Sequence, residues 1–448
     1  MSIATHTPVV DASRIGLFQY SSALLARSQE PVSGFAESRK RTRCDAGAWG
    51  IQRLPTELLC AIFAMCGDTN EVFSYPRDED MHATRAKNRD RTKTTYLRAT
   101  VHISRVCSRW FAVTRGCPQL WTAVDVALPQ PSDITALKLA LRYSDGLPLI
   151  LRIDDNLYTP PHRRTESIPR QFMELVASTA HRWAEVSIIL LHGPPAVLDV
   201  IEPLLAVPRN SFVSLARATL RFEDDKHASA ASRLWEALYG SPMLRAVQWF
   251  YVRVHAPALT LQQLTHIGVN AIRPEEVMGL LQACPRLEIL QAIVEPAPDI
   301  YPGQNDGYLI PAMPAPIILP HLQVLMLSGM YDWSHFFEGL TVPRLNRLDL
   351  NIVGIQADAI QAMLRRSSAH LYMLTLRWLY AGNEREIVAL LQSPELQNLK
   401  ILRYHPYDGP EDEPDSFDPT PYLPSALLVL TRTYEDAESS YHALVTNR

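Results

Sequence analysis

Pro343-Arg-Leu-Asn-Arg-Leu-Asp-Leu350 carries apolar residues in the spacing L-x-x-L-x-L, and this spacing decides the fold. The last two apolar positions alternate along a short strand, and the first anchors the turn that leads into it. All three side chains are therefore expected to face one core. The same spacing occurs in these copies: Leu244/Val247/Trp249, Leu264/Ile267/Val269, Leu287/Leu290/Ala292, Leu322/Leu325/Leu327, Leu345/Leu348/Leu350, Leu371/Leu374/Leu376 and Leu396/Leu399/Ile401.

The intervals between these copies indicate a repeat architecture. Their first positions lie 20, 23, 35, 23, 26 and 25 residues apart, and weaker copies precede them at Trp183/Val186/Ile188 and Leu215/Ala218/Leu220. Residues 148–153 predict a further strand, and stretches of helical character, such as 274–283 and 386–391, follow the copies. The pattern resembles leucine-rich repeats. That resemblance implies an α/β solenoid, a curved parallel sheet with helices on its convex side, in which neighbouring repeats bury each other's apolar faces.

A doubly wound α/β sheet would also alternate strands with helices, so it stays open as an alternative. The repeat period is irregular, and the Asn or Cys of the full leucine-rich repeat is missing. Neither G-x-G-x-x-G nor G-x-x-x-x-G-K-[ST] follows any predicted strand, however, which disfavours a nucleotide-binding fold.

A second pattern lies nearer the N-terminus. It consists of Leu-Pro-Thr-Glu-Leu-Leu-Cys-Ala-Ile-Phe at 54–63, Val-Cys-Ser-Arg-Trp at 106–110 and Leu-Trp at 120–121. Apolar residues at 58, 59, 62, 63 and 66 form one helical stripe, and those at 103, 106, 107, 110 and 111 form another. Neither short helix can bury its apolar face alone. Each must therefore pack on the other, on Leu120 and Trp121, or on a partner chain.

These residues, in this order, resemble an F-box. In F-box proteins the Leu-Pro turn and the apolar helix faces bind a Skp-type adaptor, which connects the chain to a cullin. By position, the resemblance implies adaptor contacts through Leu54, Pro55, Leu58, Leu59, Ile62 and Phe63, with Val106, Cys107, Trp110, Leu120 and Trp121 as core or secondary contacts. Docking of this kind usually depends on a few apolar and aromatic anchors.

The spacing departs from a compact F-box because a polar insertion, rich in Arg and Lys, occupies residues 67–96. This insertion resembles those found in the large mushroom-type fungal F-box family. Residues 181–188 also resemble the first repeat of that family, so the resemblance covers about 49–430. The competing interpretation is an ordinary helical hairpin whose two apolar stripes pack against each other to form its own core.

Composition favours a sizeable protein and excludes several classes. The 448 residues are 47% hydrophobic and 20% charged, enough for more than one domain. The formal net charge of -4 and pI near 6.4 argue against a dedicated nucleic-acid binder. No stretch resembles a membrane span or a secretory signal, so a cytoplasmic or nuclear location is expected, and no membrane partner.

Motifs for catalysis or metal binding are not found in the sequence. The six cysteines contain no C-x-x-C pair and are expected to be reduced thiols, and the histidines form no zinc-binding pattern. No G-x-S-x-G elbow, paired-carboxylate pattern or activated-cysteine signature is present. The chain is therefore expected to be a non-enzyme with no cofactor and no metal.

The chain divides into four predicted parts. These are a disordered tail at 1–48, the F-box at 49–127, the repeat domain at 128–430 and a cap or tail at 431–448. A proline-rich stretch at 295–320 accounts for the longest interval between repeats, and an acidic run covers 409–418. Either could contact a target, although loops of such composition are more often simply solvated.

The expected function is that of the substrate-recognition subunit of a Skp-cullin-F-box ubiquitin ligase, which binds an unknown target protein through its repeats. The alternative is a leucine-rich-repeat scaffold that acts outside any ubiquitin ligase. A hydrolase on an α/β sheet is a more distant third. Arginines near the strand ends, including Arg344, Arg347, Arg377 and Arg403, would form an anion site if they converge.

Overall fold

The structure is a computed structural model. It describes residues 51, 54–67, 96–127, 129, 131–154, 170–190, 197–222, 228–250, 256–294, 308–309, 315–329, 331–352, 354–379, 384–406, 419–432 and 443–445. The predicted tail at 1–48, nearly all of the polar insertion, most of the proline-rich stretch and the acidic run lie outside the described residues. Residues Leu54–Arg448 form one compact unit, separate from Met1–Arg53, and the description below concerns that unit.

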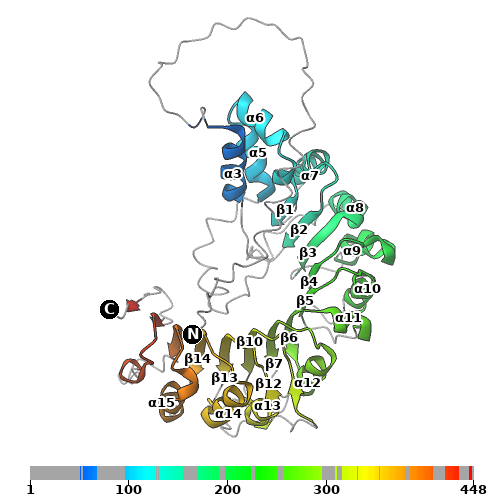
Figure 1. The fold of residues 1–448 in the computed structure, drawn as a ribbon. Coiled ribbons are helices and arrows are strands. Elements are labelled where there is room, and N and C mark those ends of the chain that lie inside the picture. Colours follow the sequence, from blue (N-terminus) through cyan, green and yellow to red (C-terminus); the bar gives the residue numbers. More distant parts are fainter. Residues whose placement is uncertain are drawn as a thin grey trace, which may run out of the picture. The chain divides into compact units, whose positions relative to one another are not determined.

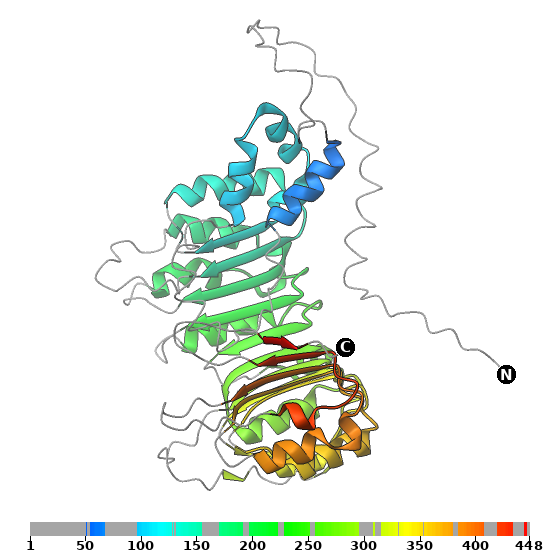
Figure 2. The same cartoon turned by 90° about the vertical axis from the view of Figure 1, so that its left-hand side faces the viewer.

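Within the described residues, a 13-stranded sheet dominates the fold. Its neighbouring strands follow the order of the sequence, and twelve of them are parallel, while the last pairs antiparallel with β16. Figure 2 shows these strands side by side. They are β1 (Ala123–Ala127), β2 (Leu149–Asp154), β3 (Trp183–Leu190), β4 (Arg217–Phe222), β5 (Ala246–Phe250), β6 (His266–Ile272), β7 (Ile289–Val294), β10 (Val324–Gly329), β13 (Arg347–Ile352), β14 (Met373–Leu379), β15 (Ile401–Pro406), β16 (Val429–Arg432) and β17 (Ala443–Val445).

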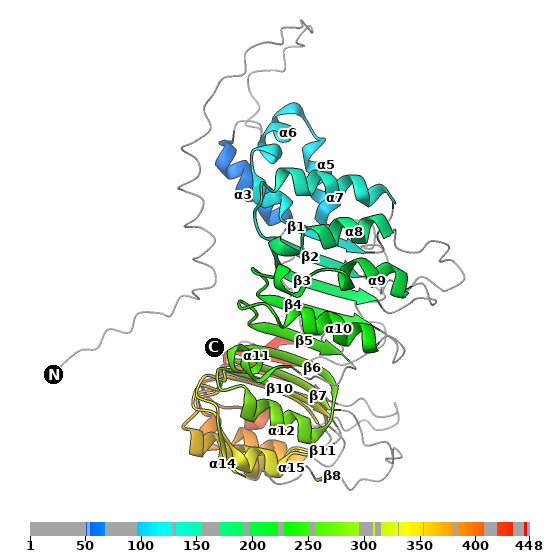
Figure 3. The same cartoon turned by 90° about the vertical axis from the view of Figure 1, so that its right-hand side faces the viewer.

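Helices follow most of the strands in the chain and lie along one side of the sheet (Figures 1 and 3). They are α7 (Pro131–Tyr143), α8 (Arg170–Ser178), α9 (Val197–Leu205), α10 (Ala228–Leu238), α11 (Ala258–Gln263), α12 (Pro274–Ala283), α13 (Ser334–Gly339), α14 (Ala357–Ser367) and α15 (Glu384–Leu391). The sheet face turned away from these helices is called the second face below. The chain is thus an α/β protein with a large parallel sheet, as the repeat spacing predicted.

Shorter elements complete the described fold. Three helices precede the sheet: α3 (Thr56–Gly67), α5 (Tyr96–Ser104) and α6 (Ser108–Arg115). The 3-10 turns are η2 (Pro118–Trp121), η4 (Ala180–Arg182), η5 (Arg209–Ser211), η7 (Pro394–Leu396) and η8 (Thr420–Tyr422). Two small parallel pairs join β8 (Tyr308–Leu309) to β11 (Tyr331–Asp332) and β9 (Ile317–Ile318) to β12 (Leu340–Thr341). No helix in the described part of the chain is long and apolar enough to cross a membrane.

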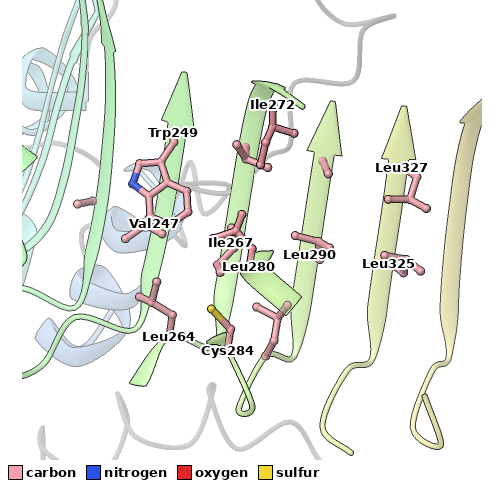
Figure 4. Close-up of a cluster of buried hydrophobic side chains, with 14 of the residues drawn as sticks. Val247, Trp249, Leu264, Ile267, Ile272, Leu280, Cys284, Leu290, Leu325 and Leu327 are labelled. Carbon is pink, nitrogen blue, oxygen red and sulfur yellow. The ribbon is translucent and has the colours of Figure 1, made fainter. Parts of the chain in front are cut away.

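The apolar positions of the repeats form continuous rows between the sheet and the helices. Val247 of β5 lies opposite Ile267, which lies opposite Leu290, and the row continues through Leu325 and Leu348. All five side chains are buried. Figure 4 shows the first four of them on neighbouring strands. Full burial of one such side chain contributes about 1.5–3 kcal/mol. Each strand therefore stabilises the next through the same row.

The last copy of the repeat starts at Leu399 and not at the predicted Leu396. Leu396 and Leu399 are buried as expected, but Ile401 is half-buried, and Leu402 and Tyr404 take the core positions opposite Leu374 and Leu376. The spacing L-x-x-L-x-L fits from residue 396 and also, with Tyr404 as its last position, from residue 399. The turn η7 ends at Leu396, and β15 begins at Ile401, so the copy that starts at Leu399 is the correct one.

A further copy lies at the N-terminal end of the array, and the buried Leu427 and Leu430 continue the pattern at the other end. Trp121, Val124 and Val126 have the repeat spacing, and the two valines lie opposite Leu151 and Ile153 of β2. At the other end, Leu430 lies opposite Leu402. The sequence analysis missed the copy with Trp121 because it assigned Leu120 and Trp121 to the F-box pattern. The predicted boundary at residue 127 stays a prediction, although β1 before it already belongs to the sheet.

A candidate docking surface on the N-terminal helices

Helix α3 carries two adjoining apolar stripes that differ in burial. Leu59 and Phe63, four residues apart, are buried. Leu58 and Met65, seven residues apart and so on one side of the helix, are 51% and 76% exposed. Ile62 lies between the stripes and is half-buried. One stripe of α3 therefore belongs to the core, and the other faces outward.

The turn between α5 and α6 adds to the exposed apolar surface. Val106 is 61% exposed, and Phe111 in the first turn of α6 is 43% exposed. Cys107 caps α6: its sulfur accepts a hydrogen bond from the Trp110 amide at 3.4 Å. The cap sets the start of α6, and thereby places Phe111 at the surface and Trp110 toward α3.

Contacts across the three helices hold this part together. The Phe63 and Trp110 rings lie 4.7 Å apart between centroids, and the Arg109 guanidinium donates a hydrogen bond to the Leu54 carbonyl oxygen. The Thr100 hydroxyl donates to the Leu120 carbonyl oxygen at 3.1 Å. These bonds join segments that are 20 to 55 residues apart in the chain.

Trp121 connects the helices to the sheet. Its indole N–H donates to the Thr114 carbonyl oxygen of α6 at 2.7 Å, and its ring lies 5.1 Å from Tyr143 of α7. Arg115 lies over the Phe111 ring at 5.2 Å and over the Tyr143 ring at 5.1 Å. Trp121 is also the first position of the repeat copy that continues into β1. The position of α6 is therefore coupled to that of β1.

The predicted adaptor contacts fall into three groups by exposure. Leu59, Phe63, Leu120 and Trp121 are buried; Leu54, Ile62, Cys107 and Trp110 are half-buried; Pro55, Leu58 and Val106 are exposed. The structure thus brings all three segments of the pattern together. Only the exposed and half-buried groups offer side chains to a partner without unfolding.

The sequence pattern missed two exposed apolar residues, Met65 and Phe111, as members of the candidate site. The spacing of seven residues between Leu58 and Met65 is the signal that would have found the first. No periodicity distinguishes the outward Phe111 from the half-buried Trp110 beside it, because their difference depends on where Phe63 lies. Tertiary packing therefore decides which member of an apolar stripe faces outward.

Two thiols of this part of the chain interact with each other. Cys60 of α3 and Cys117 before η2 share a side-chain hydrogen bond, which lowers the pKa of Cys60 and raises that of Cys117. Of the residues described, no three His, Cys, Asp or Glu side chains gather as a metal site would require. Exposed apolar groups on short helices can bury area against a partner groove.

No protein-family model matches the chain, and no curated protein sequence matches it.

Proposed function

We propose that this chain is the substrate-recognition subunit of a Skp-cullin-F-box ubiquitin ligase. In this proposal, α3, α5, α6 and η2 form the F-box and dock a Skp-type adaptor, which connects the chain to a cullin. The parallel sheet and its helices form a leucine-rich-repeat-like solenoid that binds the target protein. The assembled ligase would work in the cytoplasm or the nucleus.

The observation that carries the proposal is the exposed apolar group Leu58, Met65, Val106 and Phe111 on the N-terminal helices. Exposed apolar side chains that gather on one side of an element, as Leu58 and Met65 do on α3, are candidates for an interaction site. The neighbouring Leu59 and Phe63 already supply the internal core of these helices. The outward side chains are thus available to a partner without loss of that core.

The chain's contribution to ubiquitin transfer would be binding and orientation. The bond-forming chemistry would belong to other subunits of the ligase. By holding a target beside the ubiquitin carrier, the chain would raise the effective concentration of the acceptor lysine. It would therefore be a non-enzyme that acts through proximity.

The test is capture of a Skp-type adaptor by the full chain. We expect stoichiometric capture by the wild type, and its loss in Leu58→Asp/Val106→Asp, because both side chains are exposed and a charge there opposes burial against a groove. Leu259→Asp/Leu428→Asp is the matched control, since these two side chains are 80% and 55% exposed outside the N-terminal helices. Absence of capture by the wild type would contradict the proposal and favour a scaffold outside any ligase.

A further inference from the structure

The second face of the sheet carries the strand residues between the core positions. Because side chains alternate along a strand, Gln248 of β5 and Gln291 of β7 lie on this face, while the residue before each of them is buried in the core. Gly268 of β6 lies between the two glutamines, since it is the register partner of both. Two amide side chains thus flank one glycine in the middle of the face.

The middle of the second face is uncharged at neutral pH. The strands on either side of it carry charges on this face, namely Arg217 and Arg221 on β4 and Arg347 and Asp349 on β13. On β5, β6, β7 and β10, the described side chains that face this way include no Asp, Glu, Lys or Arg. Burial, with a smaller effect from Arg217, lowers the pKa of His266 on β6 to about 4, so its ring is neutral at pH 7. An uncharged ligand therefore matches these four strands better than a charged one.

Aliphatic side chains border the two amides. Ile289 and Ile293 lie two residues before and after Gln291 on β7, and Met326 of β10 is the register partner of Gln291. All three are half-buried. They offer apolar contact to a ligand that also carries amide groups.

The amide oxygen of Gln291 is buried and has no hydrogen-bond partner. The residue is 9% exposed, and its Oε1 receives no hydrogen bond. The side chain of Gln248 lies over the intervening glycine, where a Cβ atom at Gly268 would be 3.1 Å from Gln248 Cγ, but it does not supply the missing donor. Buried polar groups in native structures are nearly always hydrogen-bonded, so this acceptor calls for an explanation. A ligand with an N–H group would supply the donor.

We propose that the second face of β5 to β7 binds an uncharged peptide segment of the target, which donates an N–H to Gln291 Oε1 and accepts a hydrogen bond from the Gln248 amide. This rests on the proposed function, since it specifies the target that the receptor part recognises. A peptide group offers one N–H and one C=O, which complement the oxygen and the NH₂ group of a glutamine amide. A nucleic acid or an acidic peptide would bring charges that meet no cation on these strands.

The test selects ligands from a phage library that displays random twelve-residue peptides, with the full chain immobilised. We expect enriched peptides with fewer Asp, Glu, Lys and Arg residues than the starting library. The most enriched peptide is then synthesised with a fluorescent label, and its Kd is measured by fluorescence anisotropy. Gln248→Leu/Gln291→Leu should raise that Kd about tenfold or more, because the substitutions remove both amides that pair with the peptide.

The matched control is Gln262→Leu/Gln282→Leu, which makes the same two substitutions at exposed positions of α11 and α12, outside the second face. It should leave the Kd unchanged. Absence of enrichment, enrichment of charged peptides, or a Kd that the two double variants affect equally would overturn the proposal. The assay contains no adaptor, so its outcome is independent of whether the chain joins a ligase.

Thermal unfolding provides a second readout that separates binding from folding. Gln291→Leu removes an unsatisfied acceptor, so the melting temperature should stay unchanged or rise while the Kd rises. A fall in melting temperature together with the loss of affinity would show that Gln291 acts through the fold, and the proposal would be wrong. Gln248→Leu alone, at the half-buried position, carries the affinity test if circular dichroism shows that the double variant is unfolded.

Discussion

The indole of Trp110 in α6 packs against the ring of Phe63 in α3, with 4.7 Å between ring centroids and an angle of 55° between ring planes. Phe63 belongs to the buried core together with Leu59 and Leu120, and the half-buried Trp110 packs against it. With Phe63 turned inward, the adjoining stripe of α3 faces outward. The same packing therefore stabilises the helices and creates the apolar surface proposed for docking.

Substitutions on the two stripes of α3 should affect stability and adaptor capture differently. Leu59→Ala removes a fully buried side chain and is expected to cost about 2–5 kcal/mol of unfolding free energy. Leu58→Ala, at the exposed neighbouring position, should change stability by roughly 0.5 kcal/mol or less and should weaken capture. Urea unfolding and adaptor pull-down measure the two effects. Equal destabilisation by both variants would contradict the assignment of inner and outer stripes.

Arg109 should support the turn at Leu54 and Pro55. Arg109→Leu removes the hydrogen bond to the Leu54 carbonyl oxygen and is expected to cost roughly 1–3 kcal/mol while lowering adaptor affinity. Arg105→Leu, at an exposed position in the α5–α6 turn, is the control. Thermal unfolding and capture would be measured for both. If the two variants behave alike, the bond has no particular role in the turn.

The corrected register of β15 can be tested with neighbouring residues. Leu402→Ala should cost about 2–5 kcal/mol because Leu402 is fully buried in the core row. Ile401→Ala should cost roughly 1 kcal/mol, since Ile401 is half-buried on the second face. Urea unfolding of the two variants decides between the registers. If Ile401→Ala lowered the free energy of unfolding more than Leu402→Ala, the copy that starts at Leu396 would be the correct one.

His266 should make stability depend on pH. Burial, with a smaller effect from Arg217, lowers the pKa of His266 to about 4. Below the unfolded-state pKa of about 6.5, the unfolded chain binds a proton that the folded chain refuses, so stability falls as the pH falls toward 4. The loss from pH 7 to 4.5 should be about 2–3 kcal/mol. His266→Gln should show a correspondingly smaller loss in urea unfolding at the two pH values; an unchanged pH dependence would rule out this residue as its source.

The thiols should differ in reactivity. The hydrogen bond with Cys117 lowers the pKa of Cys60, whereas burial raises the pKa of Cys284 to about 12. Because the thiolate is the reactive form, iodoacetamide at pH 8 should alkylate Cys60 before Cys117 and Cys284. Peptide mass spectrometry follows each site in the native protein. Cys117→Ala should slow alkylation of Cys60, and Cys117→Ser, which keeps a donor, should slow it less.

The extent of sequence-based prediction is clearest along the sheet. The spacing L-x-x-L-x-L identified the core positions of most strands because the two-residue alternation of a strand appears directly in the order of apolar residues. It failed at β15, where two overlapping copies fit. It also missed Trp121, Val124 and Val126, since Trp121 was assigned to the F-box pattern. A spacing rule cannot choose between two overlapping copies when both place apolar residues at all three positions.

The candidate sites divide in the same way. The apolar stripes around Leu59 and Trp110 were readable as helix faces, but their spacing did not show that Leu58 and Met65 face outward while Phe63 meets Trp110. Those assignments depend on contacts between residues far apart in the chain.

By itself, the sequence determined which residues are apolar on each helix and strand, and hence that the chain forms a parallel α/β sheet with helices. Local periodicity carries that information because secondary structure repeats every 2 or 3.6 residues. Only the tertiary structure decided which apolar side chains remain exposed, where the first and last repeat copies lie, and which charges share a face. These properties depend on which segments pack together, and neither the sheet register nor the contact of Phe63 with Trp110 is encoded in local spacing.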